Sequence, residues 1–434
     1  MFCLTWQFIA LVTYTSSRSI LGLSQEVPVK SVAAHSEDCL AIIRDSSALE
    51  MPLGDAVGSV LVRDAIAKVS LPPADMAGRD GYAIRSTDSR GAGENNPVFL
   101  PVVGEIRAGE DTYSALPPGH AMKVSSGSLL PKNADCVVPL EETDDGRAKV
   151  AIHVEVAEGD GVRYEAEDFE GVLPALEAGT RIGSRHVALL AAAGLGTVAV
   201  KPPPRVVVMS IGDELIEPGK TGHPGTVYDA DSCGLATAIR EVGATVFRVP
   251  QVPDSKQELR GELLNQIVRA DIIITTGGLS LGGHDNVKEV VGQLGNVRFD
   301  RVAMTPVRQY GVGTIGEGDT QVPIFCLPGN PVAALLGYEL FIRPALRQAV
   351  GHKSVHRRTI QATAIRPWSS QEGLEEFVPV KVVGKPSTGY RFEPTGMQGT
   401  ELLYGLARAN ALAAIPADKE TVAVGDTVTC LILD

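Results

Sequence analysis

The stretch that most restricts the fold of this chain is residues 271–288, DIIITTGGLSLGGHDNVK. Three consecutive isoleucines lead to a glycine pair without an intervening charge, which is typical of a strand buried on both faces of a parallel sheet. The following loop contains Gly277, Gly278, Gly282 and Gly283. Glycine lets backbone N–H groups approach an anion closely. Residues 287–294 then have the pattern of a helix. A buried strand, a glycine loop and a helix N-terminus predict an oxyanion site at the carboxyl edge of a sheet.

Asp285 stands near the start of that predicted helix. Its carboxylate could hold a divalent cation beside a bound phosphate, or it could serve only as the N-cap of the helix. The sequence leaves both interpretations open.

The composition restricts the class of protein. A chain of 434 residues suggests roughly three domains, and 44% hydrophobic with 21% charged residues is ordinary for a globular protein. The net charge of −13 argues against nucleic acid as the main partner, because a phosphate backbone selects for basic surfaces. The six cysteines are scattered without a CxxC pair, which indicates reduced thiols and a cytoplasmic protein.

The first residues have a different character. Residues 2–14 are apolar but too short to span a bilayer, and no basic segment precedes them as in a signal peptide. We expect residues 1–30 to form a disordered extension, and we expect no membrane attachment.

The rest of the chain changes character several times. Helical spacing in residues 31–66 is followed by short β-type runs, and Pro202, Pro203 and Pro204 form a stiff joint. Strands and helices then alternate up to a helix at residues 331–350, which indicates an open α/β sheet, and the C-terminal part is rich in β-type runs again. The predicted domains are 31–73 with 149–203 (a split N-terminal domain), 74–148 (a β-rich insertion), 204–352 (an α/β domain) and 353–434 (a C-terminal β-barrel).

Three predicted strands of the α/β domain end in loops rich in glycine and polar residues. Parallel strands deliver their carboxyl ends to one edge, so these loops should line one crevice. Ordinary turn chemistry explains any one loop alone, but together they favour a site for phosphate and a cation. The loops contain Gly212, Asp213 and Glu214; Gly277, Gly278, Ser280 and Gly282; and Pro328, Gly329, Asn330 and Pro331.

Further acidic residues stand in loop contexts. They are Asp80, Asp135, Glu167, Asp168, Asp229 and Asp231. Loop carboxylates are usually only solvated, but several that converged on one point would suit Mg²⁺, which prefers oxygen ligands.

The chain resembles the molybdopterin molybdenumtransferases, the family of MoeA and the gephyrin E domain, from about residue 31 to its end. The segments LPPADMAGRDGYAIR, SSGSLLPKNADCVV, GDEL, YDADS, TTGGLSLGGHDNVKEV, LPGNPVAAL and LARANAL follow one another in the order of that family. The resemblance implies an elongated homodimer of four-domain subunits, with an α/β domain similar to MoaB and Mog.

The resemblance also implies an activity. Enzymes of this family insert molybdate into adenylylated molybdopterin, release AMP and use Mg²⁺. It implies catalytic roles for Asp285, Asp229, Asp80 and Glu167, with Asp285 and Asp229 as metal ligands. In the shared cleft of a dimer, Asp80, Asp135 and Glu167 would face the partner subunit. The residues expected to bind substrate are Asp135, Arg308 and the loop residues Gly212, Asp213, Glu214, Gly277, Gly278, Ser280, Gly282, Pro328, Gly329, Asn330 and Pro331. The expected partners are a second copy of the chain, the adenylylating enzyme and molybdoenzymes.

This chain departs from the family pattern at positions near the expected molybdate. Thr305 stands where the family has Lys, Ala333 where it has Ser, and Leu374 where it has Arg, while Arg308 takes the place of a second Lys. Each lost charged hydrogen bond is worth roughly 1.5 to 3 kcal/mol, so the oxyanion pocket should be weakened. Three interpretations stay open: an active molybdenumtransferase, a non-catalytic or altered-specificity pterin-nucleotide binder or scaffold, and a different nucleotide pyrophosphatase on the same α/β fold.

Overall fold

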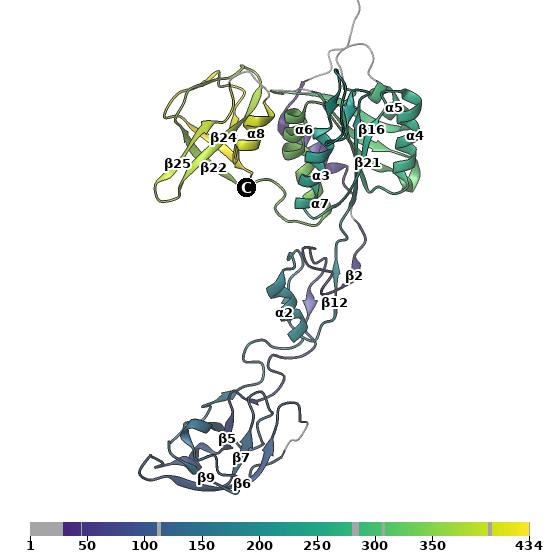
Figure 1. Ribbon diagram of the computed structural model, residues 1–434. Helices are drawn as coiled ribbons and strands as arrows, with labels where there is room; N and C mark the ends of the chain where they lie inside the picture. The colour runs from purple at the N-terminus through teal and green to yellow at the C-terminus, as the bar shows by residue number, and fades with distance from the viewer. Residues whose placement is uncertain are drawn as a thin grey trace, which may run out of the picture.

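The protein is an elongated molecule with two units side by side at one end, a narrow stalk and a separate β unit at the other end (Figure 1). The computed structural model describes residues 29–44, 46–110, 114–279, 286–305, 309–397 and 402–433, apart from the side chain of Asp319. Among these residues, none of the helices is both long and apolar enough to cross a membrane.

A seven-stranded sheet forms the centre of the α/β unit. Its order is β1-β18-β20-β21-β17-β13-β16. The strands β16, β13, β17 and β21 run parallel to one another, while β20 is antiparallel to both of its neighbours, β18 and β21. The strands are β1 (Val29–Lys30), β13 (Arg205–Ile211), β16 (Thr245–Val252), β17 (Ile272–Thr276), β18 (Gly295–Val302), β20 (Gln309–Ile315) and β21 (Val322–Leu327).

Helices cover both faces of this sheet and make a three-layer unit (Figure 1). The faces alternate along β17, because Ile272 and Ile274 pack in one core with α1, α3, α6 and α7, while Ile273 packs in the other with α4 and α5. The helices are α1 (Val32–Ala41), α3 (Ala230–Glu241), α4 (Lys256–Ile267), α5 (Asn286–Leu294), α6 (Pro331–Gly337) and α7 (Arg343–Ala349). A π-helical turn, η4 (Tyr338–Ile342), joins α6 to α7.

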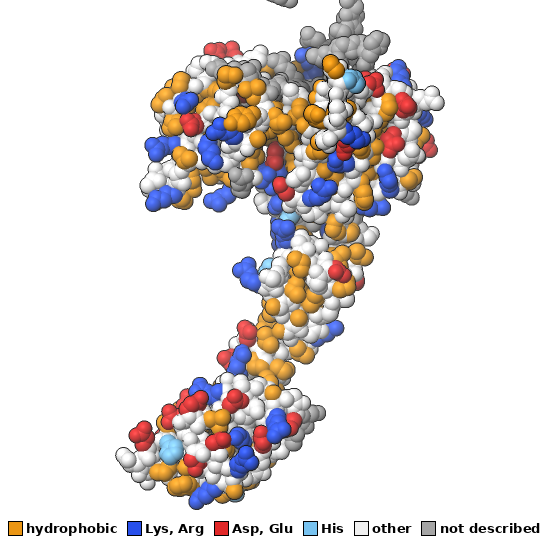
Figure 2. All heavy atoms as spheres, in the orientation of Figure 1, with side chains coloured by type: hydrophobic (Ala, Val, Ile, Leu, Met, Phe, Trp, Pro, Cys, Tyr) orange, Lys and Arg blue, Asp and Glu red, His pale blue; other side chains and the backbone are white. Residues whose placement is uncertain are grey.

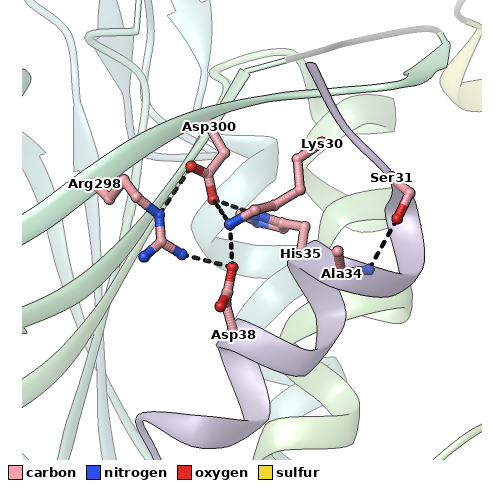
Figure 3. Close-up of polar contacts among 7 residues, drawn as sticks. All are labelled: Lys30, Ser31, Ala34, His35, Asp38, Arg298 and Asp300. Atoms are coloured by element: carbon pink, nitrogen blue, oxygen red, sulfur yellow. Dashed lines mark hydrogen bonds and ion pairs between the residues drawn. The ribbon is translucent and has the colours of Figure 1, made fainter. Parts of the chain in front are cut away.

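The N-terminal segment is fastened to the α/β unit by a buried polar network (Figure 3). Asp300 on β18 is 5% exposed and accepts hydrogen bonds from Nδ1 of His35 (3.0 Å), Nζ of Lys30 (3.2 Å) and Nε of Arg298 (2.9 Å). Asp38 accepts from Arg298 at 2.6 Å and also binds Lys30. The strand β1 and the helix α1 therefore belong physically to the α/β unit. Val29 and Lys30, which we expected in the extension, form a strand beside β18.

The stalk and the distal unit are built from residues between α1 and β13. In the stalk, the antiparallel pair β2–β12 and the helix α2 enclose a small core of their own. The distal unit has a five-stranded sheet of order β8-β5-β7-β6-β9. Stalk elements are β2 (Leu49–Pro52), β3 (Ala65–Ile66), β11 (Pro174–Leu176), α2 (Ser184–Ala192) and β12 (Thr197–Val200). Distal elements are β4 (Met76–Ala77), β5 (Gly81–Ile84), η1 (Ser86–Ser89), β6 (Val98–Ile106), β7 (Ala121–Val124), β8 (Cys136–Pro139), η2 (Leu140–Glu142), β9 (Lys149–Ile152) and β10 (Val162–Arg163).

The C-terminal unit is a closed β-barrel. Its strands pair in the order β24-β25-β22-β28-β26, and β26 pairs back with β24. Phe377 and Leu412 of the barrel lie in the same core as α6 and α7, so the barrel packs directly on the α/β unit. The elements are β19 (Met304–Thr305), β22 (Thr359–Ala364), β23 (Trp368–Ser369), β24 (Glu375–Lys385), β25 (Gly389–Pro394), α8 (Leu403–Arg408), β26 (Ala411–Ile415), β27 (Thr421–Val422) and β28 (Thr427–Ile432).

The predicted fold class, with an α/β domain, a β-rich domain and a C-terminal barrel, is confirmed by this architecture. Four strands form the parallel sheet that we predicted. The sheet continues with β20, which is antiparallel to β21, and with β18, which is antiparallel to β20. The helix predicted at residues 331–350 is divided into α6, the π-helical turn and α7. The helical spacing of residues 31–66 gives one helix, α1, followed by the stalk strands β2 and β3.

Candidate functional site

The loops after β13, β17 and β21 meet at the carboxyl edge of the sheet, and glycines make this close approach possible. A Cβ atom added to Gly277 would lie 2.2 Å from the carbonyl oxygen of Ile211, and one added to Gly329 would lie 3.1 Å from Cα of Gly277. Gly277 and Gly278 also have positive φ angles of 86° and 68°. Only residues without a side chain allow these three loops to touch.

The loops enclose a pocket of about 410 Å³ between them. This volume is in the range of small-molecule sites. Seven of the residues that we predicted for substrate or metal binding line it: Gly212, Glu214, Asp229, Gly277, Gly278, Gly329 and Pro331. The pocket also has walls that we did not predict, from Leu215, Tyr228, Asp254 and Thr276.

Two of the four pocket glycines cannot offer their N–H groups to an anion. The N–H of Gly212 donates to the carbonyl of Val252, and that of Gly277 donates to the carbonyl of Leu327. No described residue accepts from the N–H groups of Gly278 and Gly329. The first pair therefore lets the loops close, and the second pair is available to a phosphate.

Asp229 is fully engaged by protein groups. It is the N-cap of α3, and its Oδ1 accepts from the backbone N–H of Ser232 (3.0 Å) and from Oγ of Ser210 (2.9 Å). Its Oδ2 accepts from Oγ of Ser232 and lies 3.6 Å from Nη2 of Arg248. A carboxylate that already accepts three hydrogen bonds and faces a guanidinium group is poorly suited to bind a metal directly.

Asp231, two residues later, has the opposite environment. It is 7% exposed, it lines the pocket, and its Oδ1 is buried without a hydrogen-bond partner among the described residues. Burial, and secondarily the charge of Asp229, raise the pKa of Asp231 to about 7, against a hydrogen bond from Thr276. A buried carboxyl oxygen without a partner is unusual, and it marks this position as functional or strained.

The described residues contain no cluster of three or more His, Cys, Asp or Glu side chains that could hold a metal ion. A protein cage for a cation is therefore absent from this part of the chain. The free oxygen of Asp231 fits a cation that takes most of its ligands from substrate and water, as Mg²⁺ commonly does.

The other predicted residues of these loops lie beside the pocket. Asp213 accepts a hydrogen bond from the N–H of Asp254 at 3.2 Å. Asn330 caps α6, because its Oδ1 accepts from the N–H groups of Val332 (3.0 Å) and Ala333 (3.1 Å). Pro328 is buried before that cap. Four predicted residues, Ser280, Gly282, Asp285 and Arg308, fall outside the described residues.

Asp80 directly precedes β5 and Asp135 directly precedes β8 in the distal unit, and Glu167 lies in the connection from β10 of the distal unit to β11 of the stalk. The distal unit is at the opposite end of the molecule from the α/β unit (Figure 1). Asp80 accepts from the N–H of Ser126 at 2.8 Å, and Asp135 accepts from the N–H of Ser86 at 2.6 Å. Glu167 accepts from the N–H of Tyr164 at 3.2 Å and lies 3.7 Å from Nε of Arg163. Within one chain these three acids do not join the pocket.

Two of the three departures from the family pattern come together at the junction with the barrel. Thr305 on β19 pairs with Glu376 on β24, and Leu374 directly precedes that strand. Leu374 is buried, and Ala333 is fully buried in the first turn of α6. Burial raises the pKa of Glu375, which follows Leu374 in the sequence. This junction is apolar and acidic, which suits a dianion poorly.

Three family models match most of the described chain. Residues 29–194 match the model of the MoeA N-terminal region (domain I and II), residues 207–348 match a probable molybdopterin binding domain, and residues 361–433 match the MoeA C-terminal region (domain IV). The three matches follow in the same order as the units described above.

Individual relatives are similar over almost their full length. Molybdopterin molybdenumtransferase 2 of Mycobacterium tuberculosis is 36% identical over 403 residues, which are 92% of this chain and 98% of that protein. Molybdopterin molybdenumtransferase 1 of the same organism is 34% identical, over 88% of this chain and 93% of that protein. A crystal structure of a molybdopterin biosynthesis MoeA protein from Pyrococcus horikoshii is 28% identical, with a TM-score of 0.80, and covers 94% of this chain and 100% of its own.

Proposed function

The chain belongs to the molybdopterin molybdenumtransferase (MoeA) family and is a transferase of molybdenum cofactor biosynthesis, and we propose that the pocket at the carboxyl edge of its sheet binds adenylylated molybdopterin. The observation that supports this most directly is the meeting of three glycine loops around a pocket of about 410 Å³. The reaction proposed there is insertion of molybdate into the dithiolene, with hydrolysis of the adenylate and release of AMP.

In this proposal different residues of the pocket contact different parts of the substrate. The N–H groups of Gly278 and Gly329 bind the phosphoryl oxygens, and Glu214 and Asp254 line the wall beside them. Tyr228 and Leu215 provide an aromatic and an aliphatic surface for a flat ring. The close approach of Gly277 to Ile211 leaves no room for a side chain on this side of the pocket.

We propose that Mg²⁺ assists the reaction and is bound by Asp231, by Asp285 and by oxygen atoms of the substrate. The role of Asp285 stays a prediction from sequence. A bound Mg²⁺ would offset charge on the phosphoryl group during hydrolysis. We also predicted Asp229 as a metal ligand, but its oxygens already accept hydrogen bonds from the protein. In this proposal Asp229 instead fixes the start of α3 and thereby positions Asp231.

A homodimer belongs to the same proposal. The acids Asp80, Asp135 and Glu167 can serve a pocket of the α/β unit only if a second copy brings its distal unit to it, because within one chain they lie at the far end of the stalk (Figure 1). A location in the cytoplasm and contacts with the adenylylating enzyme and with molybdoenzymes stay predictions from sequence.

The alternative is a pterin-nucleotide binder with weak or altered oxyanion specificity. The observation that favours it is the apolar and acidic junction around Thr305, Leu374 and Glu375. The similarity over all three family models counts against a pyrophosphatase on an isolated α/β domain.

A reconstitution assay tests the proposal. The protein is given adenylylated molybdopterin, Mg²⁺ and molybdate, and AMP release is measured together with molybdenum on the product. We expect both to depend on Mg²⁺, and we expect Asp285→Ala to abolish both while the melting temperature stays unchanged. AMP release without molybdenum on the product would support the alternative, and unchanged activity of Asp285→Ala would reduce that residue to a helix cap.

A further inference from the structure

A second cleft lies where α7, the segment after it and the barrel meet, and its charge is opposite to that of the whole protein. The chain has a net charge of −13, yet no Asp or Glu occurs between Glu339 and Glu372. That stretch contains six Lys and Arg residues: Arg343, Arg347, Lys353, Arg357, Arg358 and Arg366. Five of them line one cleft of about 1040 Å³, which we call the basic cleft. It shares no lining residue with the pocket of the α/β unit.

Structural roles account for only part of this charge. Arg357 binds Glu339 with two nitrogens (2.8 and 2.9 Å) and Leu433 O with a third (2.6 Å), and Arg343 lies 3.7 Å from Glu339. Arg347 donates from Nε to the carbonyl of Ser354 at 3.0 Å and stands in the last turn of α7, where a cation is favourable. Glu339 is therefore the one carboxylate shared by Arg343 and Arg357, and Arg347 contacts only a backbone carbonyl in these hydrogen bonds.

The remaining charges of the basic cleft have no acidic partner among the described residues. Lys353 and Arg358 are exposed, and neither forms an ion pair there. The excess positive charge shifts the pKa values of neighbouring side chains. Burial, then Arg347 and Arg181, lower the pKa of His352 to about 4. Burial, then Arg181 and Arg357, also lower the pKa of Arg347. A positive potential that destabilises its own side chains is one that an anion would relieve.

The opposite wall of the basic cleft is apolar. Ile360, Val382, Tyr390 and Ile432 of the barrel face the cations. Figure 2 shows Lys and Arg side chains along the lower edge of the upper units and at the neck where the stalk begins. The stalk also borders the basic cleft. A Cβ atom added to Gly179 of the stalk would lie 2.3 Å from Cε of Lys353. A ligand in this place would touch the barrel and the end of the α/β unit beside the stalk.

We propose that the basic cleft is a second ligand site, which binds a small phosphorylated compound with a flat apolar ring. Guanidinium and ammonium groups pair with phosphate, and the ring packs on the barrel wall around Tyr390. The volume is at the upper limit for a small-molecule site, and cations beside an apolar wall match a ligand with an anionic and an apolar end. An acidic peptide would pair with the cations but would make fewer contacts with the apolar wall.

The probe for the test is 1-naphthyl phosphate, compared by calorimetry with its two halves, inorganic phosphate and 1-naphthol. We expect the whole probe to bind at least about tenfold more tightly than either half, because both walls then contribute. The double variant Lys353→Gln/Arg358→Gln changes exposed side chains only, so it should fold normally, and it should weaken binding by about tenfold or more. Tyr390→Leu should weaken naphthyl phosphate but leave inorganic phosphate unchanged.

Arg366→Gln is the matched control, since Arg366 belongs to the same acid-free stretch but lies outside the cleft, 3.4 Å from Glu393. Its binding should equal that of the unaltered protein. Equal binding by the double variant would assign the probe to another surface and overturn the proposal. So would poly-glutamate that binds through Lys353 and Arg358 while naphthyl phosphate does not, because the cleft would then be a docking surface for acidic protein.

Discussion

At the scale of single residues, Asp231 makes the stability of the folded protein depend on pH. The pKa of Asp231 is about 7 in the folded protein and near 4 when unfolded. The unfolded chain therefore loses this proton first, and the stability falls as pH rises from about 4 to 7. We expect Asp231→Asn to remove that loss and to stabilise the protein at pH 8 by about 2 to 4 kcal/mol. Urea unfolding at pH 8 and at pH 4.5 measures the difference.

The control for this prediction is Asp229→Asn. Asp229 accepts three hydrogen bonds and forms an ion pair with Arg248, so its loss should destabilise the protein at both pH values, by about 1 to 3 kcal/mol. An Asp231→Asn variant that is no more stable at pH 8 than at pH 4.5, relative to the unaltered chain, would show that Oδ1 of Asp231 has a partner in solution.

At the scale of elements, the buried network around Asp300 determines whether β1 and α1 stay on the sheet. Burial alone would raise the pKa of Asp300, but hydrogen bonds from Arg298, His35 and Lys30 hold it below its usual range. Asp300→Asn leaves these donors without a charged acceptor, and we expect a loss of about 3 kcal/mol of stability. Protease cleavage within α1 should become faster, as measured by mass spectrometry. Glu50→Gln, in the exposed pair with Arg63, should change stability by less than about 1 kcal/mol.

The same elements show what the sequence could and could not reveal. The isoleucines of β17 and the glycines after it are local signals, and they were sufficient to predict a buried strand and a pocket at its end. The network of Lys30, His35 and Asp300 joins residues more than 260 positions apart, and no local pattern indicates such a pairing. Likewise, no local pattern in residues 331–350 indicated the π-helical turn at Tyr338–Ile342. Asp231 was visible as a loop acid, but its unpartnered oxygen is a property of the packed structure.

At the scale of the whole molecule, the distance between the pocket and the distal acids predicts activity that depends on two subunits. Asp80→Ala and Asp285→Ala should each be inactive alone. When the two variants are co-expressed, half of the dimers are mixed, and each mixed dimer has one intact cleft, so about one quarter of the unaltered activity should return. No recovery, or a monomer in sedimentation at micromolar concentration, would contradict the shared cleft. The readout is AMP release per subunit.

We expect the junction between the α/β unit and the barrel to determine how much molybdate the reaction needs. Thr305, Ala333 and Leu374 offer no positive charge to a dianion, and Glu375, next to Leu374 on the strand that pairs with β19, has its pKa raised by burial. We therefore expect adenylylated molybdopterin to bind with ordinary affinity, while the molybdate concentration for half-maximal transfer is high. The triple change Thr305→Lys, Ala333→Ser and Leu374→Arg should lower that concentration by more than the product of the single effects, since the three groups would share one anion. Adenylate affinity should barely change, because none of these residues lines the pocket at the sheet edge. Efficient transfer at low molybdate by the unaltered protein, with no gain from the triple change, would mean that other residues such as Arg308 already complete the oxyanion site.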